Sequence, residues 1–215
     1  ISAEGENVKF PYADINEPKI INPLDAGGQV EVWLKDIERV MRKSVARTLD
    51  VAIEAYDETR RTKWILEWPG QIVLCVTQLF WTQNVTKAMT DAGWKGVKAE
   101  CTKCTQQIEA IVRLVRGKLT KLERKTISPL VVLDVHSRDV LIELVTNKVS
   151  VDTDFAWQSQ LRYYYNANGQ SAVTAEAESV EARIINALRL YGNEYLGNSM
   201  RLVITPLTDR CYRTL

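Results

Sequence analysis

Three short stretches of this sequence hold the residue types that most often carry out chemistry. The first contains the only histidine, His136, which lies between Asp134 and Asp139 and next to Ser137. Histidine, serine and aspartate can form a catalytic triad, but close neighbours on one helix do not face one another and cannot relay a proton. We therefore expect His136 to be a packed, hydrogen-bonded helix residue, and we expect the chain to hold no catalytic residue. An independent enzyme that uses His136 and Asp139 is the alternative.

The second stretch is a pair of cysteines, Cys101 and Cys104, which are separated by two residues. This spacing occurs in zinc and redox sites, but the sequence has no second pair. Both residues fall on the apolar stripe of an expected helix, so we expect core thiols and no metal site. The other cysteines are Cys75 and Cys211, and such sparse use indicates a reducing compartment.

The third stretch is Leu202–Leu207, LVITPL. Its first three residues have the apolar, β-branched character of a short buried strand. Pro206 would end that strand, because proline cannot donate a hydrogen bond to a sheet. From residue types alone, a buried strand and turn is the plain interpretation.

The overall composition is that of an ordinary folded protein. The 215 residues are 46% hydrophobic and 26% charged, with a formal net charge of +1. A charge this small gives no global attraction to nucleic acid or to an anionic membrane. The basic run from Arg113 to Lys125 is typical of a solvated helix face, and the longest apolar runs, such as Pro129–Leu133, are far too short to cross a bilayer. We therefore expect neither a nucleic-acid nor a membrane partner.

Apolar residues recur at three- and four-residue steps before Asp154, which is the pattern of amphipathic helices. We expect Gly93 to end the second helix and Gly117 to weaken the third by about 1 kcal/mol. Ser128-Pro129 has the residue types that start a helix, although the following LVVL run alone would also suit a buried strand. The expected helices are Gln29–Glu58, Gln71–Ala92, Lys95–Arg124 and Ser128–Val145, with a break at Thr59–Pro69 in which Trp64 and Trp68 anchor helix to helix.

The remaining segments are shorter. Alternating polar residues from Thr174 to Arg183 argue for strands with a bulge or hairpin turn near Ser179, although their Ala and Glu content also suits a helix. We also expect an edge strand at Val8–Phe10, a docked helix in Asp154–Tyr165, a turn at Tyr195–Ser199 and a helix that starts at Arg210 with Thr208-Asp209 as its N-cap. The expected fold is mainly α, an elongated multi-helix bundle with a small β-hairpin region near the C-terminus.

The last part of the chain resembles a known family. Arg201–Tyr212, RLVITPLTDRCY, resembles the segment that opens the first AAA+ module of dynein heavy chains, although Asn193 and Met200 stand where that family usually has an aromatic residue and a proline. Residues 166–190 match poorly, and Tyr165 replaces a common tryptophan. Four further runs resemble the C-terminal part of the dynein linker and occur in the family's order: Gly28–Met41, Trp64–Thr82, Leu114–Asp139 and Asp154–Tyr164. The sequence of Leu114–Asp139 resembles axonemal heavy chains more than cytoplasmic ones.

This resemblance implies a mechanical role. Residues 1–165 would be the helical base of the linker rod, residues 166–190 a hairpin connection, and residues 191–215 the truncated start of the first AAA+ module. In the family, the linker is a lever that bends on ATP binding and straightens on product release. The resemblance also implies which residues help to form the adenine pocket, namely Val203, Ile204, Thr205, Pro206 and Leu207.

The parent motor that the resemblance implies is an ATPase that binds ATP or ADP with Mg²⁺. The phosphate-binding residues would lie outside this segment, because the sequence has no G-x-x-x-x-G-K-[ST] loop. The implied partners are the AAA+ ring of the same heavy chain, intermediate and light chains, and microtubules, in the cytoskeleton of a ciliary or flagellar axoneme. A chain that ends as a helix starts is expected to be a fragment. The alternative is a stand-alone helical scaffold that binds a protein partner and truly ends at Leu215.

Overall fold

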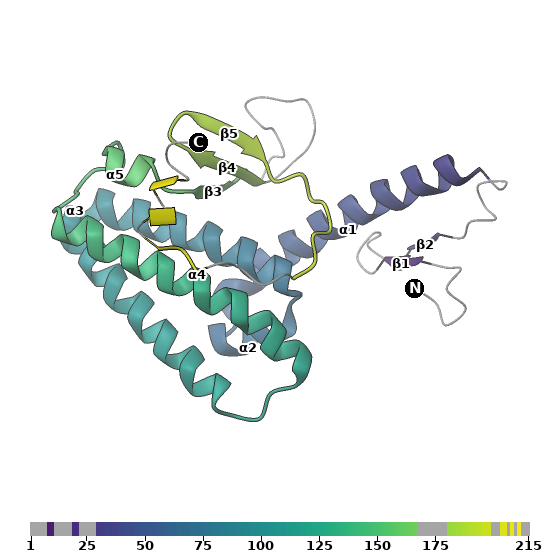
Figure 1. Ribbon diagram of the computed structural model, residues 1–215, viewed down its shortest axis with the longest axis horizontal. Coiled ribbons are helices and arrows are strands. Elements are labelled where there is room, and N and C mark those ends of the chain that lie inside the picture. Colours follow the sequence, from purple (N-terminus) through teal and green to yellow (C-terminus); the bar gives the residue numbers. More distant parts are fainter. Residues whose placement is uncertain are drawn as a thin grey trace.

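The computed structural model describes residues 29–166, 180–198, 203–205, 207, 208, 210 and 211, together with the backbone of two short strands at 8–10 and 19–21. Helices make up most of this part of the chain, and a small sheet lies against them (Figure 1). The expected mainly α fold with a small β region near the C-terminus is therefore confirmed. The helices are α1 (Val30–Glu58), α2 (Arg61–Glu67), α3 (Gly70–Val115), α4 (Lys121–Thr146) and α5 (Phe155–Gln158).

The strands form two antiparallel sheets. The expected edge strand is confirmed as β1 (Val8–Phe10), and it pairs with β2 (Lys19–Ile21), a partner that the sequence did not indicate. The second sheet has the order β3–β4–β5 and lies against α3. The expected turn near Ser179 falls outside the described residues. The strands of this sheet are β3 (Arg162–Tyr165), β4 (Val180–Ile184) and β5 (Ala187–Leu190).

Two hydrophobic clusters hold the helical body together. The larger one lies among α1, α2, the start of α3 and α4, and it includes the fully buried Leu49 and Trp64. Trp64 donates from Nε1 to the carbonyl of Ala52 at 3.1 Å, so this tryptophan does join helix to helix as expected. The smaller cluster surrounds the fully buried Trp157, whose ring centroid lies 5.2 Å from that of Trp81.

The long helix α3 consists of two helical parts that meet at Gly93, where φ is 58° and ψ is −144°. The expected end of the second helix at Gly93 is thus confirmed, although a new helical part follows at once. A Cβ at Gly96 would collide with the backbone carbonyl of Ala88, so the two parts approach closely beside the bend. The second part ends at Val115, and Gly117 lies in the connection that follows, so the expectation of Gly117 inside a helix was wrong.

The next helix, α4, begins at Lys121, well before the expected start at Ser128-Pro129. Thr120 and Glu123 form a capping box: the Thr120 hydroxyl accepts from Glu123 N at 3.2 Å, and the Glu123 carboxylate accepts from Thr120 N at 2.6 Å. The hydrogen bond from the Thr120 backbone lowers the pKa of Glu123. Because this cap satisfies the first turn, α4 runs through Pro129 instead of starting there, and that expectation was wrong.

Two further expectations need correction. The expected break at Thr59–Pro69 contains the short helix α2, which buries Trp64 and Ile65. Within Asp154–Tyr165 only the first half is helical: the Asp154 carboxylate accepts from Ala156 N at 2.8 Å and caps α5. The second half is the strand β3, because its backbone pairs with β4 instead of continuing the helix.

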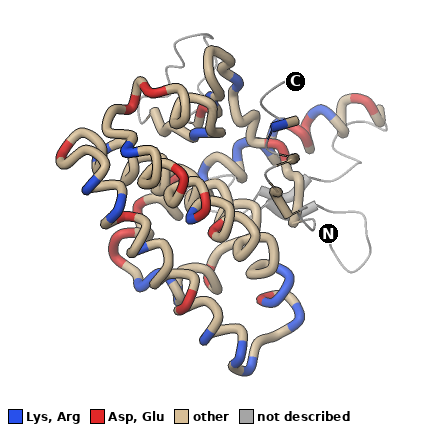
Figure 2. The backbone as a smooth tube through the Cα atoms, turned by 60° about the vertical axis from the view of Figure 1, so that its left-hand side comes forward, with Lys and Arg blue, Asp and Glu red and all other residues tan. Residues whose placement is uncertain are grey.

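Charged residues of both signs are mixed along the helices (Figure 2). The basic side chains between Arg113 and Lys125 are exposed at the end of α3, in the following loop and at the start of α4, which confirms the expected solvated face. In the part of the chain that the structure describes, no helix is both long enough and apolar enough to cross a membrane.

Candidate functional site

After β5 the chain leaves the small sheet and crosses the helical body (Figure 1). We call Tyr191–Asn198 the joint. Its path uses three residues with positive φ: Gly192 at 79°, Asn193 at 47° and Gly197 at 66°. Glycine adopts this conformation without steric cost, and asparagine tolerates it better than most residues. Gly197 has a positive φ, but the backbone of residues 195–198 forms neither a turn nor a bend, and the turn of the joint lies at Gly192-Asn193. The turn expected at Tyr195–Ser199 was therefore wrong as far as Asn198, where the described part of this stretch ends.

Gln71, in the first turn of α3, clamps the backbone of the joint. Its Nε2 donates to the carbonyl of Glu194 at 2.6 Å, and its Oε1 accepts from Leu196 N at 2.9 Å. Nε2 also lies 3.3 Å from the hydroxyl of Tyr191. The side chain is only 7% exposed, so an amide that would be costly to bury alone is satisfied by the backbone of the joint.

A second contact comes from Arg42 on α1. Its Nη1 donates to the carbonyl of Gly192 at 3.2 Å, and its Nη2 donates to the carboxylates of Glu194 at 3.1 Å and Glu38 at 2.9 Å. These ion pairs are partly exposed, so each contributes little to stability. Their effect is geometric, since one guanidinium connects α1 to both the backbone and a side chain of the joint.

The joint begins in the core at Tyr191. Its N–H donates to the carbonyl of Val180 at 3.0 Å, and its ring centroid lies 6.1 Å from that of Tyr163. Burial raises the pKa of Tyr191 and also that of the neighbouring thiol of Cys75. Both groups therefore stay protonated at neutral pH, and the joint enters the helical body through uncharged, well-packed contacts.

Beyond the joint, Thr205 and Thr208 cap a short helical segment. Thr208 N donates to Thr205 Oγ1 at 3.3 Å, and Thr205 N donates to Thr208 Oγ1 at 2.8 Å. This reciprocal pattern makes Thr205 the N-cap, and residues 207, 208, 210 and 211 are helical. The expected N-cap at Thr208-Asp209 and helix start at Arg210 were therefore wrong, because the threonine hydroxyls cap each other one turn earlier.

The residues expected to line an adenine pocket are largely open to solvent. Val203 is 67% exposed and Leu207 is 72% exposed, while Ile204 is half-buried and Thr205 is exposed. The residues at 203–205 are not in a strand, so the buried strand expected there was wrong. Pro206 falls outside the described residues. The described residues leave Val203 and Leu207 uncovered, so their apolar side chains are available to a ligand or to further chain.

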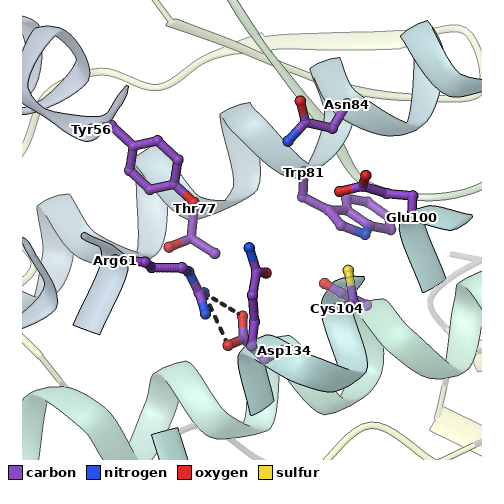
Figure 3. Close-up of a pocket in the computed structure, with 10 residues that line it drawn as sticks. Tyr56, Arg61, Thr77, Trp81, Asn84, Glu100, Cys104 and Asp134 are labelled. Carbon is purple, nitrogen blue, oxygen red and sulfur yellow. Dashed lines mark hydrogen bonds and ion pairs between the residues drawn. The ribbon is translucent and has the colours of Figure 1, made fainter. Parts of the chain in front are cut away.

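The body also contains a small polar pocket, of ≈ 20 Å³, between α3 and α4 (Figure 3). Arg61 Nη2 donates to both oxygens of Asp134 at 2.9 Å, which makes a buried ion pair. Burial raises the pKa of Asp134, against the opposing effect of the guanidinium. Burial is the largest influence on the pKa of Arg61 and would lower it, but the charges and hydrogen bonds of Asp134 and Tyr56 together outweigh burial and raise that pKa. Since arginine does not lose its proton in proteins, Arg61 stays charged and holds Asp134 as its counter-ion.

Cys104 also lines this pocket, and burial raises its pKa to about 12. A thiol with such a pKa is a poor nucleophile at neutral pH, so the expected core thiol is confirmed. The two aspartates near His136 in the sequence pair with arginines: Asp134 with Arg61, and Asp139 with Arg138 at 2.7 Å. His136 is half-buried on α4. Among the described residues, no cluster of three or more histidine, cysteine, aspartate or glutamate side chains could hold a metal ion.

Sequence reasoning did not identify Arg42 and Gln71 as contacts of the joint. Gln71 carries a weak signal, since it is a polar residue at the head of the apolar run IVLCV. Arg42 carries none, because it is one of many charged residues on the outer side of a helix. Both contacts join residues more than a hundred positions apart, and no local pattern reports such a pairing.

Comparison with known proteins agrees with this geometry. Residues 191–215 match the family model described as the hydrolytic ATP binding site of dynein motor region, so the joint lies at the start of that match. The chain is 46% identical over 214 residues to dynein axonemal heavy chain 12 of Homo sapiens, which covers 100% of this chain and 6% of that protein. Dynein axonemal heavy chain 3 of Homo sapiens is 46% identical over 215 residues, with 100% and 5% covered.

A third relative, dynein axonemal heavy chain 1 of Mus musculus, is 42% identical over 214 residues, with 100% of this chain and 4% of that protein covered. The chain thus spans only 4% to 6% of the length of these relatives. The similarity extends over the helical body as well as the C-terminal segment. The chain belongs to the dynein heavy chain family, and over its whole length it is similar to a segment of axonemal members.

Proposed function

We propose that this chain is a force-transmitting linker segment of a microtubule motor, which couples ATP hydrolysis in an AAA+ ring to the power stroke of ciliary or flagellar movement. The observation that carries this proposal is the joint. The segment that begins the match to an ATP-binding site is hydrogen-bonded to α1 through Arg42 and to α3 through Gln71. A displacement of that segment is thereby passed to the helical body.

The packing of the helical body suits this role. A lever must move without deforming, and close-packed protein interiors resist compression. Both hydrophobic clusters join helices that are distant in sequence, and α3 contributes to both of them. The buried rings of Trp64 in one cluster and Trp157 in the other fill much of this interior. A load applied at the start of α3 would therefore reach the far end of the body.

The same proposal gives the C-terminal stretch a nucleotide role. Val203, Ile204, Pro206 and Leu207 would form apolar walls beside the adenine of ATP or ADP, and the backbone near Thr205 would read the base edge. The open apolar side chains of Val203 and Leu207 fit such a wall. Mg²⁺ and the phosphates would be held by residues of the parent protein outside this segment, which would supply the hydrolytic chemistry.

The parent protein would have the partners of a dynein motor. These are the AAA+ ring of the same heavy chain, the intermediate and light chains, and the microtubule, in the axoneme of a cilium or flagellum. The proposal rests on the 46% identity to human axonemal heavy chains over the whole length of this chain. It assigns this segment to coupling, while hydrolysis and track binding belong to the rest of the parent chain.

The test is Gln71→Ala in the full-length heavy chain. Removing both hydrogen bonds of the clamp should loosen the joint by about tenfold or more, since each net hydrogen bond contributes about 1 kcal/mol. We expect ATPase activity to persist while microtubule gliding speed falls several-fold. The control is Gln106→Ala, which changes an exposed glutamine on the same helix and should alter neither rate. An unchanged ratio of gliding speed to ATPase rate in Gln71→Ala would contradict the proposed coupling.

A further inference from the structure

The starting observation is a proline in the middle of a helix. Pro129 lies inside α4 and has no N–H, so the carbonyl of Lys125, four residues earlier, has no helical donor. The structure supplies a donor from another part of the chain: Asn198 Nδ2 lies 2.8 Å from the carbonyl oxygen of Lys125. The last described residue of the joint thus replaces the hydrogen bond that Pro129 removes from α4.

A second, independent feature holds the same side chain. Gly70, the first residue of α3, is buried, and a Cβ built there would collide with the side-chain amide of Asn198. The amide therefore occupies space that only a residue without a side chain leaves open. Position 198 lies within the match to the ATP-binding site, whereas positions 70 and 129 lie outside it.

We infer that Asn198 is a positioning residue that fixes the joint relative to α3 and α4. It does so through a latch, by which we mean Asn198, Gly70 and the Lys125 carbonyl that has no helical donor because of Pro129. This inference rests on the proposed function, because the latch fixes where the segment next to the ATP-binding site meets the lever. The latch differs from the Gln71 clamp in one respect. Its acceptor lacks a helical donor because α4 contains a proline, so the helix and the joint depend on each other.

The test is a double-substitution cycle in the full-length heavy chain, read by hydrogen exchange of peptides that cover Glu194–Asn198. Asn198→Asp keeps the shape of the side chain and removes the donor, so exchange should rise about three- to tenfold, as expected for the loss of one hydrogen bond. Pro129→Ala gives α4 its own donor for Lys125. Asn198→Asp in that background should then raise exchange less than about twofold, because the acceptor no longer depends on the joint.

Two further variants make the outcome decisive. Gly70→Ala should raise the exchange rate as much as Asn198→Asp does. The double variant should exchange no faster than either single variant. Asn186→Asp, the same chemical change in the exposed turn between β4 and β5, should leave the joint unaffected. An equal effect of Asn198→Asp in both α4 backgrounds would overturn the latch, because a purely structural role of Asn198 does not depend on whether α4 has its own donor for the Lys125 carbonyl.

The ratio of gliding speed to ATPase rate, measured on the same variants, separates this inference from the proposed function. Exchange that follows the cycle together with a lowered ratio for Asn198→Asp supports both. Exchange that follows the cycle with an unchanged ratio supports the latch and contradicts force transmission through it. Exchange that ignores the cycle overturns the latch whatever the ratio does.

Discussion

Replacing Asp134 by alanine should destabilise the folded chain by about 3 to 5 kcal/mol, because it leaves the charge of Arg61 buried without a counter-ion. The two side chains are 13% and 9% exposed, and one guanidinium nitrogen donates to both carboxylate oxygens at 2.9 Å. Tyr56 also interacts with Arg61, but burial raises the pKa of Tyr56, so its neutral hydroxyl cannot replace the lost counter-ion. A loss of this size is about a fifth or more of the stability of a typical protein, which is about 5 to 15 kcal/mol.

The measurement is urea unfolding of the 215-residue chain at pH 7, followed by far-ultraviolet circular dichroism. The matched control is Asp139→Ala on the same helix. Asp139 pairs with Arg138 at 2.7 Å but is 55% exposed, so its loss should cost less than about 1 kcal/mol. In thermal unfolding of the same variants, we expect the Tm of Asp134→Ala to fall by about 6 to 20 °C for a chain of this size. Similar losses for the two variants would refute the reasoning, since only burial distinguishes the two pairs.

Three further predictions concern separate features of the body. Gly96→Ala should cost about 1 to 3 kcal/mol of unfolding free energy, because its Cβ would collide with backbone at the bend of α3, whereas Gly117→Ala in the open connection should cost much less. Burial, aided by a hydrogen bond to the carboxylate of Asp50, raises the pKa of Tyr165 to about 12. The contribution of Tyr165 to folding stability is therefore fully present below about pH 10 and is lost as the pH rises through about 12. Solvent screening limits this loss to about 1 kcal/mol of unfolding free energy. In unfolding curves measured from pH 9 to 12, the Tyr165→Phe variant should not show this fall in stability. At pH 8 a thiol reagent should label the exposed Cys211 at least about tenfold faster than the buried Cys104, as mass mapping of labelled peptides would show.

The helices could be predicted from the sequence where one face alone decides the structure. The apolar stripe of Gln29–Glu58 places α1 within one residue of its observed bounds. The predictions were wrong at Pro129, which was expected to start a helix, and at Gly117, which was expected to lie inside one. Pro129 stays inside α4 because Asn198 satisfies the carbonyl that it leaves open, and Gly117 follows α3 instead of interrupting it. The donor for the Lys125 carbonyl comes from a distant part of the sequence, so residues near Pro129 do not reveal it.

The candidate site was predicted only in part. The positive φ of Gly197 follows from residue type, since glycine adopts it without steric cost, but the turn expected around it lies earlier, at Gly192-Asn193. Val203 was expected to be buried because it is apolar, but it is exposed. Burial also requires other residues to cover the side chain, and the described part of the chain supplies none. The clamp by Gln71 requires two segments to meet, and helical periodicity does not report that meeting.

The joint is held mainly through its backbone, and this has a mechanical consequence. Gln71 binds the Glu194 carbonyl and the Leu196 N–H, and Arg42 binds the Gly192 carbonyl. Backbone groups cannot rotate away as side chains do, so these contacts fix the path of the chain directly. Because separate helices make the contacts, they act in parallel, and the joint moves only when several are broken together. Contacts of about 1 kcal/mol each can in this way hold the joint more firmly than any one of them alone.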